Sequence, residues 1–133
     1  MSDQPAFRSV TPIIRVADVS SSIRYYVEAL GFEKAFGWSD EAQAFGDDAP
    51  DFACVHRGDV SFFLDHGDQS AVGARHSIFL HSLDDLEALH HEYRQSGATI
   101  VEPPEDKPWG MREMLVSDPD GNTFRIGTWV GEQ

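Results

Sequence analysis

The chain has 133 residues and a mass of 14.8 kDa, which is enough for one domain with a sizeable hydrophobic core. Its composition, 41% hydrophobic and 25% charged, is typical of a globular protein and excludes a disordered or fibrous one. The net charge of -13 argues against nucleic acid or an anionic membrane surface as a partner, because both require a basic patch. The same charge has two interpretations, which are solubility alone or long-range attraction of a cationic ligand.

The location of the protein is predicted from what the chain does not contain. No apolar run approaches the roughly 20 residues of a membrane span, and residues 1–8 have no apolar segment of a secretion signal. Cys54 is the only cysteine, so the chain cannot form an intrachain disulfide. These features predict a cytoplasmic protein with no membrane partner.

The first half of the chain predicts one strand, one helix and three further strands. Residues 10–16 form a β-rich apolar run, and residues 23–30 place apolar side chains at the spacings of a helix face. Gly31 is expected to end this helix in the left-handed conformation. Three strand-like segments follow, at 32–38, 52–57 and 60–65.

The second half repeats this order. A strand at 76–80 precedes a helix that Asp84 opens and Gly97 ends, and further strands are expected at 98–102, 111–117 and 122–130. A proline-rich loop, 103–110, and an Asp-Pro-Asp-Gly turn, 118–121, separate those strands. We therefore predict an α+β fold of two paired β-α-β-β-β modules, 8–66 and 75–130, that form cupped mixed sheets in a single domain, 1–133.

One segment does not fit the repeat. Residues 39–51 carry Phe45 among the acidic side chains Asp40, Glu41, Asp47, Asp48 and Asp51. The segment is either a solvated loop or a lid that carries negative charge toward a ligand.

Paired modules of this kind resemble the vicinal-oxygen-chelate superfamily, which includes glyoxalase I, bleomycin resistance proteins, extradiol dioxygenases and fosfomycin resistance enzymes. The resemblance is carried by segments 15–26, 30–32, 83–86, 97–98 and 118–122. Within the superfamily, the run Pro108-Trp-Gly-Met-Arg-Glu113 before the Asp-Pro-Asp-Gly-Asn turn is most similar to bleomycin resistance proteins. That resemblance implies a homodimer that sequesters a cationic glycopeptide antibiotic unchanged, in clefts between the subunits.

The resemblance also implies a set of ligand contacts. The aromatic contacts of the bleomycin resistance proteins fall on Phe36, Phe52 and Trp109. Trp38 and Phe45 are further candidates to line the same cleft. Asp65, at the end of its strand, would complement a cationic ligand together with the acidic segment. We therefore predict a ligand-binding protein of the antibiotic-resistance type that takes an aromatic, cationic small molecule such as a bleomycin-family glycopeptide.

Enzymes of the superfamily hold a divalent metal with His, Glu or Gln side chains. The positions that the resemblance implies for those ligands fall on Thr11, within the strand 60–64, and on Ile78 and Arg125, where no metal-ligand type stands. His76 shares a strand face with Ile78, but one histidine cannot hold a catalytic metal. The sequence therefore favours a protein with no metal and no cofactor. A metal-dependent enzyme of the glyoxalase or dioxygenase type and a structural or regulatory dimer without ligand are the alternatives.

Overall fold

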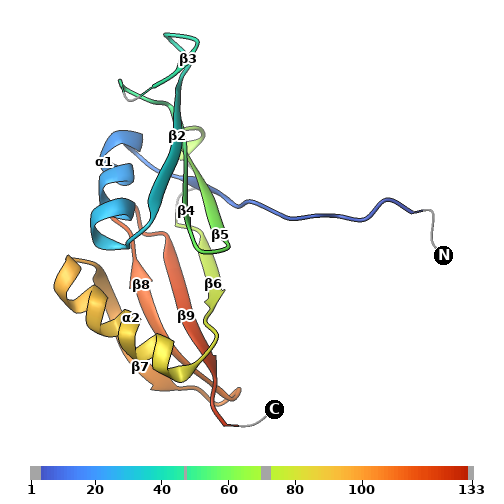
Figure 1. The fold of residues 1–133 in the computed structure, drawn as a ribbon. Coiled ribbons are helices and arrows are strands. Elements are labelled where there is room, and N and C mark those ends of the chain that lie inside the picture. Colours follow the sequence, from blue (N-terminus) through green and yellow to red (C-terminus); the bar gives the residue numbers. More distant parts are fainter. Residues whose placement is uncertain (1–3, 47, 70–72, 132–133) are drawn as a thin grey trace.

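The computed structural model describes residues 4–46, 48–69 and 73–131, and it contains the two expected modules (Figure 1). The elements of the first module are β1 Ile13–Arg15, α1 Val19–Arg24, the π-helical turn η1 Tyr25–Ala29, β2 Glu33–Ser39, β3 Ala44–Phe45, β4 Phe52–Arg57 and β5 Val60–Asp65. Those of the second are β6 Arg75–Phe79, α2 Leu83–Ser96, β7 Thr99–Asp106, β8 Met111–Ser117 and β9 Thr123–Trp129. The α+β fold of paired modules is confirmed.

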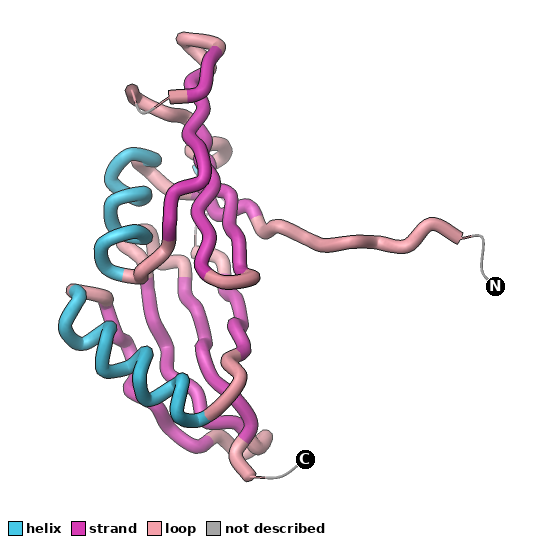
Figure 2. The backbone as a smooth tube through the Cα atoms, in the orientation of Figure 1, coloured by secondary structure: helices cyan, strands magenta, loops and turns pink. Residues whose placement is uncertain are grey.

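The two sheets share one topology. Sheet A has the strand order β1-β5-β4-β2-β3 and sheet B the order β6-β9-β8-β7. In each sheet the first strand of the module pairs in parallel with the last, and the other pairs are antiparallel. The helices of both modules lie on the same side of the sheets (Figure 2). The opposite faces of both sheets, called here the outer faces, are therefore left without a helix.

The helix boundaries follow from side chains near each end. The Asp18 carboxylate accepts hydrogen bonds from the backbone N–H groups of Ser20 and Ser21 and so caps α1. Ser82 caps α2 in the same way, whereas the sequence analysis placed the start at Asp84, which lies in the first turn. Gly97 ends α2 at a φ of 90°, a conformation that glycine adopts without a steric penalty.

One hydrophobic core joins the modules on the helix side of the sheets. It contains Tyr26 and Phe62 from the first module and Leu86, Tyr93 and Phe124 from the second, all buried. The Tyr26 hydroxyl donates a 2.8 Å hydrogen bond to Asp118 in the β8–β9 turn. The same carboxylate accepts hydrogen bonds from three nitrogens of that turn. The turn thus fastens the first module to the second.

The structure corrects the expected strand boundaries in three places. Strand β7 continues to Asp106 through two prolines, Pro103 and Pro104, where a loop was expected. Proline is tolerated because β7 is an edge strand, which leaves one side of its backbone outside the ladder. The acidic segment contains the short strand β3, paired with β2. Strand β1 covers only Ile13–Arg15, and residues 4–12 form an extended arm that leaves the body of the molecule (Figure 1).

No helix among residues 4–46, 48–69 and 73–131 is long and apolar enough to span a membrane.

Candidate functional site

Aromatic side chains gather on the outer face of sheet A. Alternation along β4 and β5 sends one set of side chains to the core and the other outward, so Phe62 is buried in the core and Phe63 is turned outward. A β-bulge in β2 shifts the pairing so that Phe36 lies opposite Cys54, beside Phe63. We name this group the sheet A aromatic cluster; its members are Phe36, Trp38, Phe45, Phe52 and Phe63.

The rings of this cluster contact one another continuously. The ring centroids of Phe52 and Phe63 are 4.9 Å apart, and those of Phe36 and Phe52 stack at 6.1 Å. Phe45 packs edge-on against Trp38, with centroids 5.0 Å apart. Phe45 is largely exposed, and the other members are half-buried. The cluster is therefore an apolar surface on which a planar molecule can stack. It brings together four of the predicted contacts, Phe36, Trp38, Phe45 and Phe52.

Three acidic groups near the cluster already have partners within the chain. Asp65, paired with Phe52 in the β4–β5 ladder, forms a 2.6 Å ion pair with Arg15. The Trp38 indole N–H donates a 3.0 Å hydrogen bond to the Asp40 carboxylate. Asp51 accepts a 2.8 Å hydrogen bond from the backbone N–H of Asp40. These contacts orient the edge of the cluster; Asp47 lies outside the described residues.

Trp109 lies far from the sheet A aromatic cluster. It belongs to the β7–β8 connection, at the end of the molecule opposite β3 (Figure 1). The side chain is 54% exposed. The loop is closed by backbone bonds from Lys107 to Met111 and from Gly110 to Lys107, and Gly110 lies against the Trp129 ring. A single chain therefore does not bring Trp109 to the other predicted contacts.

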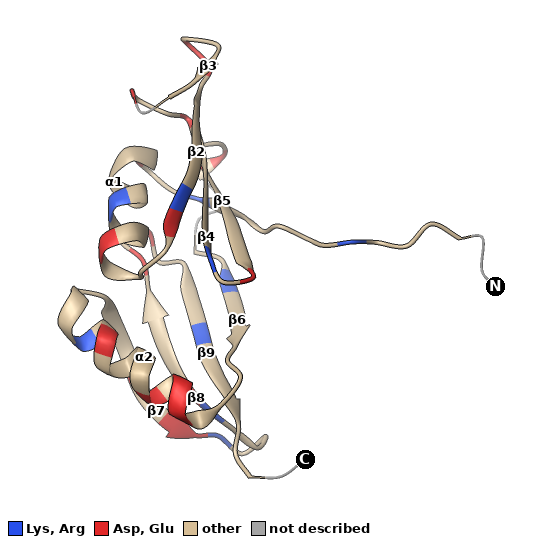
Figure 3. Ribbon diagram, in the orientation of Figure 1, with Lys and Arg blue, Asp and Glu red and all other residues tan. Residues whose placement is uncertain are grey.

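The outer face of sheet B carries residues that the sequence analysis did not select. Ser77 of β6 and Leu115 of β8 flank Arg125 in the ladder, and Phe79 of β6 lies beside Gly127. Phe79 and Trp129 are exposed. The alternation of side chains along a strand could have identified Phe79 and Trp129 in the sequence, because it places them on the same face as Arg125. Figure 3 shows basic residues on β6 and β9 and acidic ones on β7.

A model of the glyoxalase/bleomycin resistance protein/dioxygenase superfamily matches residues 8–126. The chain belongs to this superfamily.

Three individual proteins show what the chain is similar to. The chain is 28% identical to the bleomycin-binding protein of bleomycin-producing Streptomyces verticillus, solved with copper(II)-bleomycin, over 97% of this chain and 100% of that one, with a TM-score of 0.69. It is 28% identical to Virulence protein STM3117 of Salmonella typhimurium, over 89% of this chain and 81% of that protein. TnmS3, an antibiotic binding protein from Streptomyces sp. CB03234, shares the fold at 23% identity and a TM-score of 0.71, over 96% and 100% of the two chains.

The residues at the superfamily's metal positions do not fit a metal ion. Arg125 carries positive charge toward the outer face, Ile78 packs against the core, and Thr11 precedes β1. The His76 ring stacks on the Phe124 ring on the helix side of sheet B, and burial lowers its pKa. Within the described parts of the chain, no three His, Cys, Asp or Glu side chains gather in a metal-binding arrangement.

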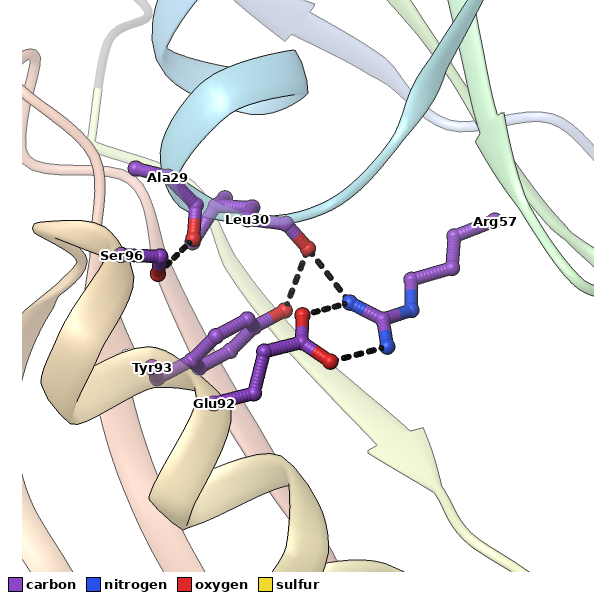
Figure 4. Close-up of polar contacts among 6 residues, drawn as sticks. All are labelled: Ala29, Leu30, Arg57, Glu92, Tyr93 and Ser96. Carbon is purple, nitrogen blue, oxygen red and sulfur yellow. Dashed lines mark hydrogen bonds and ion pairs between the residues drawn. The ribbon is translucent and has the colours of Figure 1, made fainter.

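Figure 4 shows the polar contacts that fix one module against the other. Arg57 of β4 pairs with Glu92 of α2 through two hydrogen bonds, at 2.6 and 2.9 Å. The Leu30 carbonyl, at the end of η1, accepts hydrogen bonds from Arg57 and from the Tyr93 hydroxyl. The hydrogen bond from Arg57 lowers the pKa of Glu92, and burial raises the pKa of Tyr93 to about 12. These bonds hold the two sheets in one relative position, which sets where the outer faces point.

Proposed function

We propose that this protein is a metal-free binding protein of the antibiotic-resistance type, which holds an aromatic small molecule in clefts between two copies of the chain without changing it chemically. The sheet A aromatic cluster carries the proposal, because half-buried rings that form a continuous surface on a helix-free face are suited to stacking a planar ligand. The similarity to a bleomycin-binding protein over nearly the whole chain supports it.

Two features of the single chain support a homodimer. Both outer faces lack a helix, and a second copy would cover part of that apolar surface. Phe7 and Val10, on the N-terminal arm, are almost fully exposed, as expected of a segment that packs on a neighbouring chain. In such a dimer, Trp109 of one copy reaches the sheet A aromatic cluster of the other.

Copper(II)-bleomycin and metal-free bleomycin are the first ligands to test, given the relative that binds one of them. Aromatic stacking would supply most of the affinity. The acidic segment would mainly raise the association rate of a cationic ligand, because exposed charges act at long range and are screened by salt. Asp65 contributes less to that attraction, since Arg15 already neutralises it.

Isothermal titration calorimetry with each form of bleomycin tests the proposal. Phe52→Leu, which keeps an apolar side chain but removes the stacking ring, is expected to weaken binding by about 2- to 12-fold, as a stacked ring is worth roughly 0.5–1.5 kcal/mol beyond its area. Trp109→Ala is expected to cost about 1–3 kcal/mol. Val101→Ala, an exposed apolar position on β7, is the matched control. Binding that neither ring substitution weakens would show that the cleft lies elsewhere.

Mixed dimers test whether the cleft is shared between copies. Each parent variant, Phe52→Leu or Trp109→Ala, has a defect in both clefts. A dimer with one chain of each kind has one cleft with both defects and one with none. Mixing the variants is therefore expected to restore sites of wild-type affinity in the mixed dimers. A mixture that binds no better than its parents would place each cleft within a single chain.

A further inference from the structure

A hollow with two arginines opens on the outer face of sheet B. Its volume is about 410 Å³, and its lining residues are Arg75, His76, Ser77, Leu115, Thr123 and Arg125. Among the described residues, none that lines the hollow is acidic, although the chain has a net charge of -13. The hollow is therefore locally basic on an acidic molecule.

The strand register brings its hydrogen-bond donors together. Arg75 lies opposite Thr123, and Ser77 lies opposite Arg125, in the parallel pair of β6 and β9. Arg75 and Arg125 are thus diagonal neighbours on one face, within reach of each other's long side chains. In this arrangement two guanidinium groups can hydrogen-bond one anionic group between them.

Both arginines retain donors that the chain does not use. Four other basic residues near the sheets form ion pairs of 3.3 Å or less: Arg15, Arg57, Lys107 and Arg112. The Arg75 side chain forms no ion pair or hydrogen bond with any residue that the structure describes. Arg125 forms a longer ion pair with Glu113, at 3.9 Å, which is too far for a hydrogen bond, and its buried Nη1 has no hydrogen-bond partner among the described residues.

An aromatic surface adjoins this pair on the same face. Phe79 lies beside Gly127, and the Glu113 side chain takes part of the space that a Gly127 side chain would need. Gly127 cannot be enlarged, because a Cβ there would meet the Arg112 carbonyl oxygen and the Glu113 side chain. Trp129 continues the face beyond Gly127. An exposed apolar surface therefore begins at Phe79 and Gly127, the outward-facing pair next to that of Ser77 and Arg125.

We infer that this hollow binds an acidic group of the ligand, a carboxylate, sulfonate or phosphate, whose aromatic part packs on the adjoining apolar surface. The guanidinium groups of Arg75 and Arg125 supply charge-assisted hydrogen bonds, and the Ser77 and Thr123 hydroxyls supply further donors. This inference rests on the proposed small-molecule binding function and adds an anionic group to its ligand.

Two fluorescent probes with the same ring system test this inference. 8-Anilinonaphthalene-1-sulfonate carries one acidic group, and N-phenyl-1-naphthylamine has the same rings without it. The sulfonate is expected to bind about tenfold more tightly, and only its affinity is expected to fall as sodium chloride is added. Arg75→Gln and Arg125→Gln are each expected to remove this preference and to leave the binding of the amine unchanged.

Further variants separate charge from stability. Arg125→Lys keeps the charge but loses the guanidinium fork, so it is expected to retain part of the preference. The Arg75 side chain has no partner in the described chain, so its substitution leaves no buried group without a counter-charge. Arg94→Gln, on the exposed surface of α2, is the matched control and is expected to leave both probes unaffected.

The outcomes distinguish the inference from the proposed function. Equal affinities for the two probes, unchanged by Arg75→Gln, would overturn the anionic subsite and leave aromatic binding intact. A sulfonate preference that also disappears in Arg94→Gln would show general attraction to surface charge and would overturn the inference. If only the sulfonate binds, and Arg75→Gln abolishes that binding, the anionic subsite stands and the aromatic cleft falls. If neither probe binds, both fall.

Discussion

Replacing Tyr26 by phenylalanine should weaken the attachment between the modules. The Tyr26 side chain is 0% exposed and Asp118 is 4% exposed, and their 2.8 Å hydrogen bond crosses from η1 to the β8–β9 turn. The substitution removes one hydroxyl and preserves the ring, which packs edge-on against Phe32 and Phe124. Any loss of stability therefore reports the hydrogen bond and not the packing.

The size of the effect follows from the bonds that Asp118 retains. Its carboxylate still accepts from the backbone N–H groups of Asp120 and Asn122 and from the Asn122 side chain. The cost is therefore that of one charge-assisted hydrogen bond, about 1.5–3 kcal/mol, and not the larger cost of an isolated buried charge. With an unfolding entropy of roughly 2.1 cal/mol/K per residue, this corresponds to a fall in Tm of about 5–11 °C.

Urea denaturation and calorimetry of the two proteins measure this cost, and Tyr93→Phe supplies a matched comparison. The Tyr93 hydroxyl donates to the neutral Leu30 carbonyl, which keeps its bond from Arg57. Tyr93→Phe is therefore expected to cost only about 0.5–1.5 kcal/mol. If Tyr26→Phe destabilises the protein no more than Tyr93→Phe does, the Asp118 turn is not the principal polar link between the modules.

Three further predictions concern pH, assembly and metal content. Arg57 lowers the pKa of Glu92. The stability that this pair adds is therefore present above the ordinary Glu pKa of 4.5 and is lost as the pH falls through the lowered pKa of Glu92. Because the Glu92 side chain is 43% exposed, the pair should contribute under about 1 kcal/mol. Urea denaturation between about pH 3 and pH 6 should show this loss in the wild type, and the same slope in Glu92→Gln would contradict it. Sedimentation equilibrium at micromolar concentration should give twice the chain mass of 14.8 kDa, and Phe7→Ser with Val10→Ser should shift the protein toward the monomer; a wild-type mass near 14.8 kDa would refute the homodimer. Elemental analysis of purified protein should find no stoichiometric nickel, zinc, iron or manganese, and about one metal per chain would overturn that prediction.

Local sterics and periodicity allowed much of this fold to be predicted from the sequence. Gly31 and Gly97 end the two helices because glycine enters the left-handed region without a penalty. Alternation in β5 separates the buried Phe62 from the outward Phe63, since neighbouring strand residues face opposite sides. These features depend on residues close together in the chain, so the sequence alone determined them.

Tertiary structure decided how the candidate site is distributed. Phe36 and Phe52 meet because β2 pairs with β4, whereas Trp109 lies at the other end of the molecule. Asp65, an apparent free charge in the sequence, is neutralised by Arg15 fifty positions away in the chain. Arg75 and Arg125 become neighbours only through the parallel pairing of β6 and β9. Strand register and ion pairing join residues that are distant in sequence, and local periodicity contains no information about those distances.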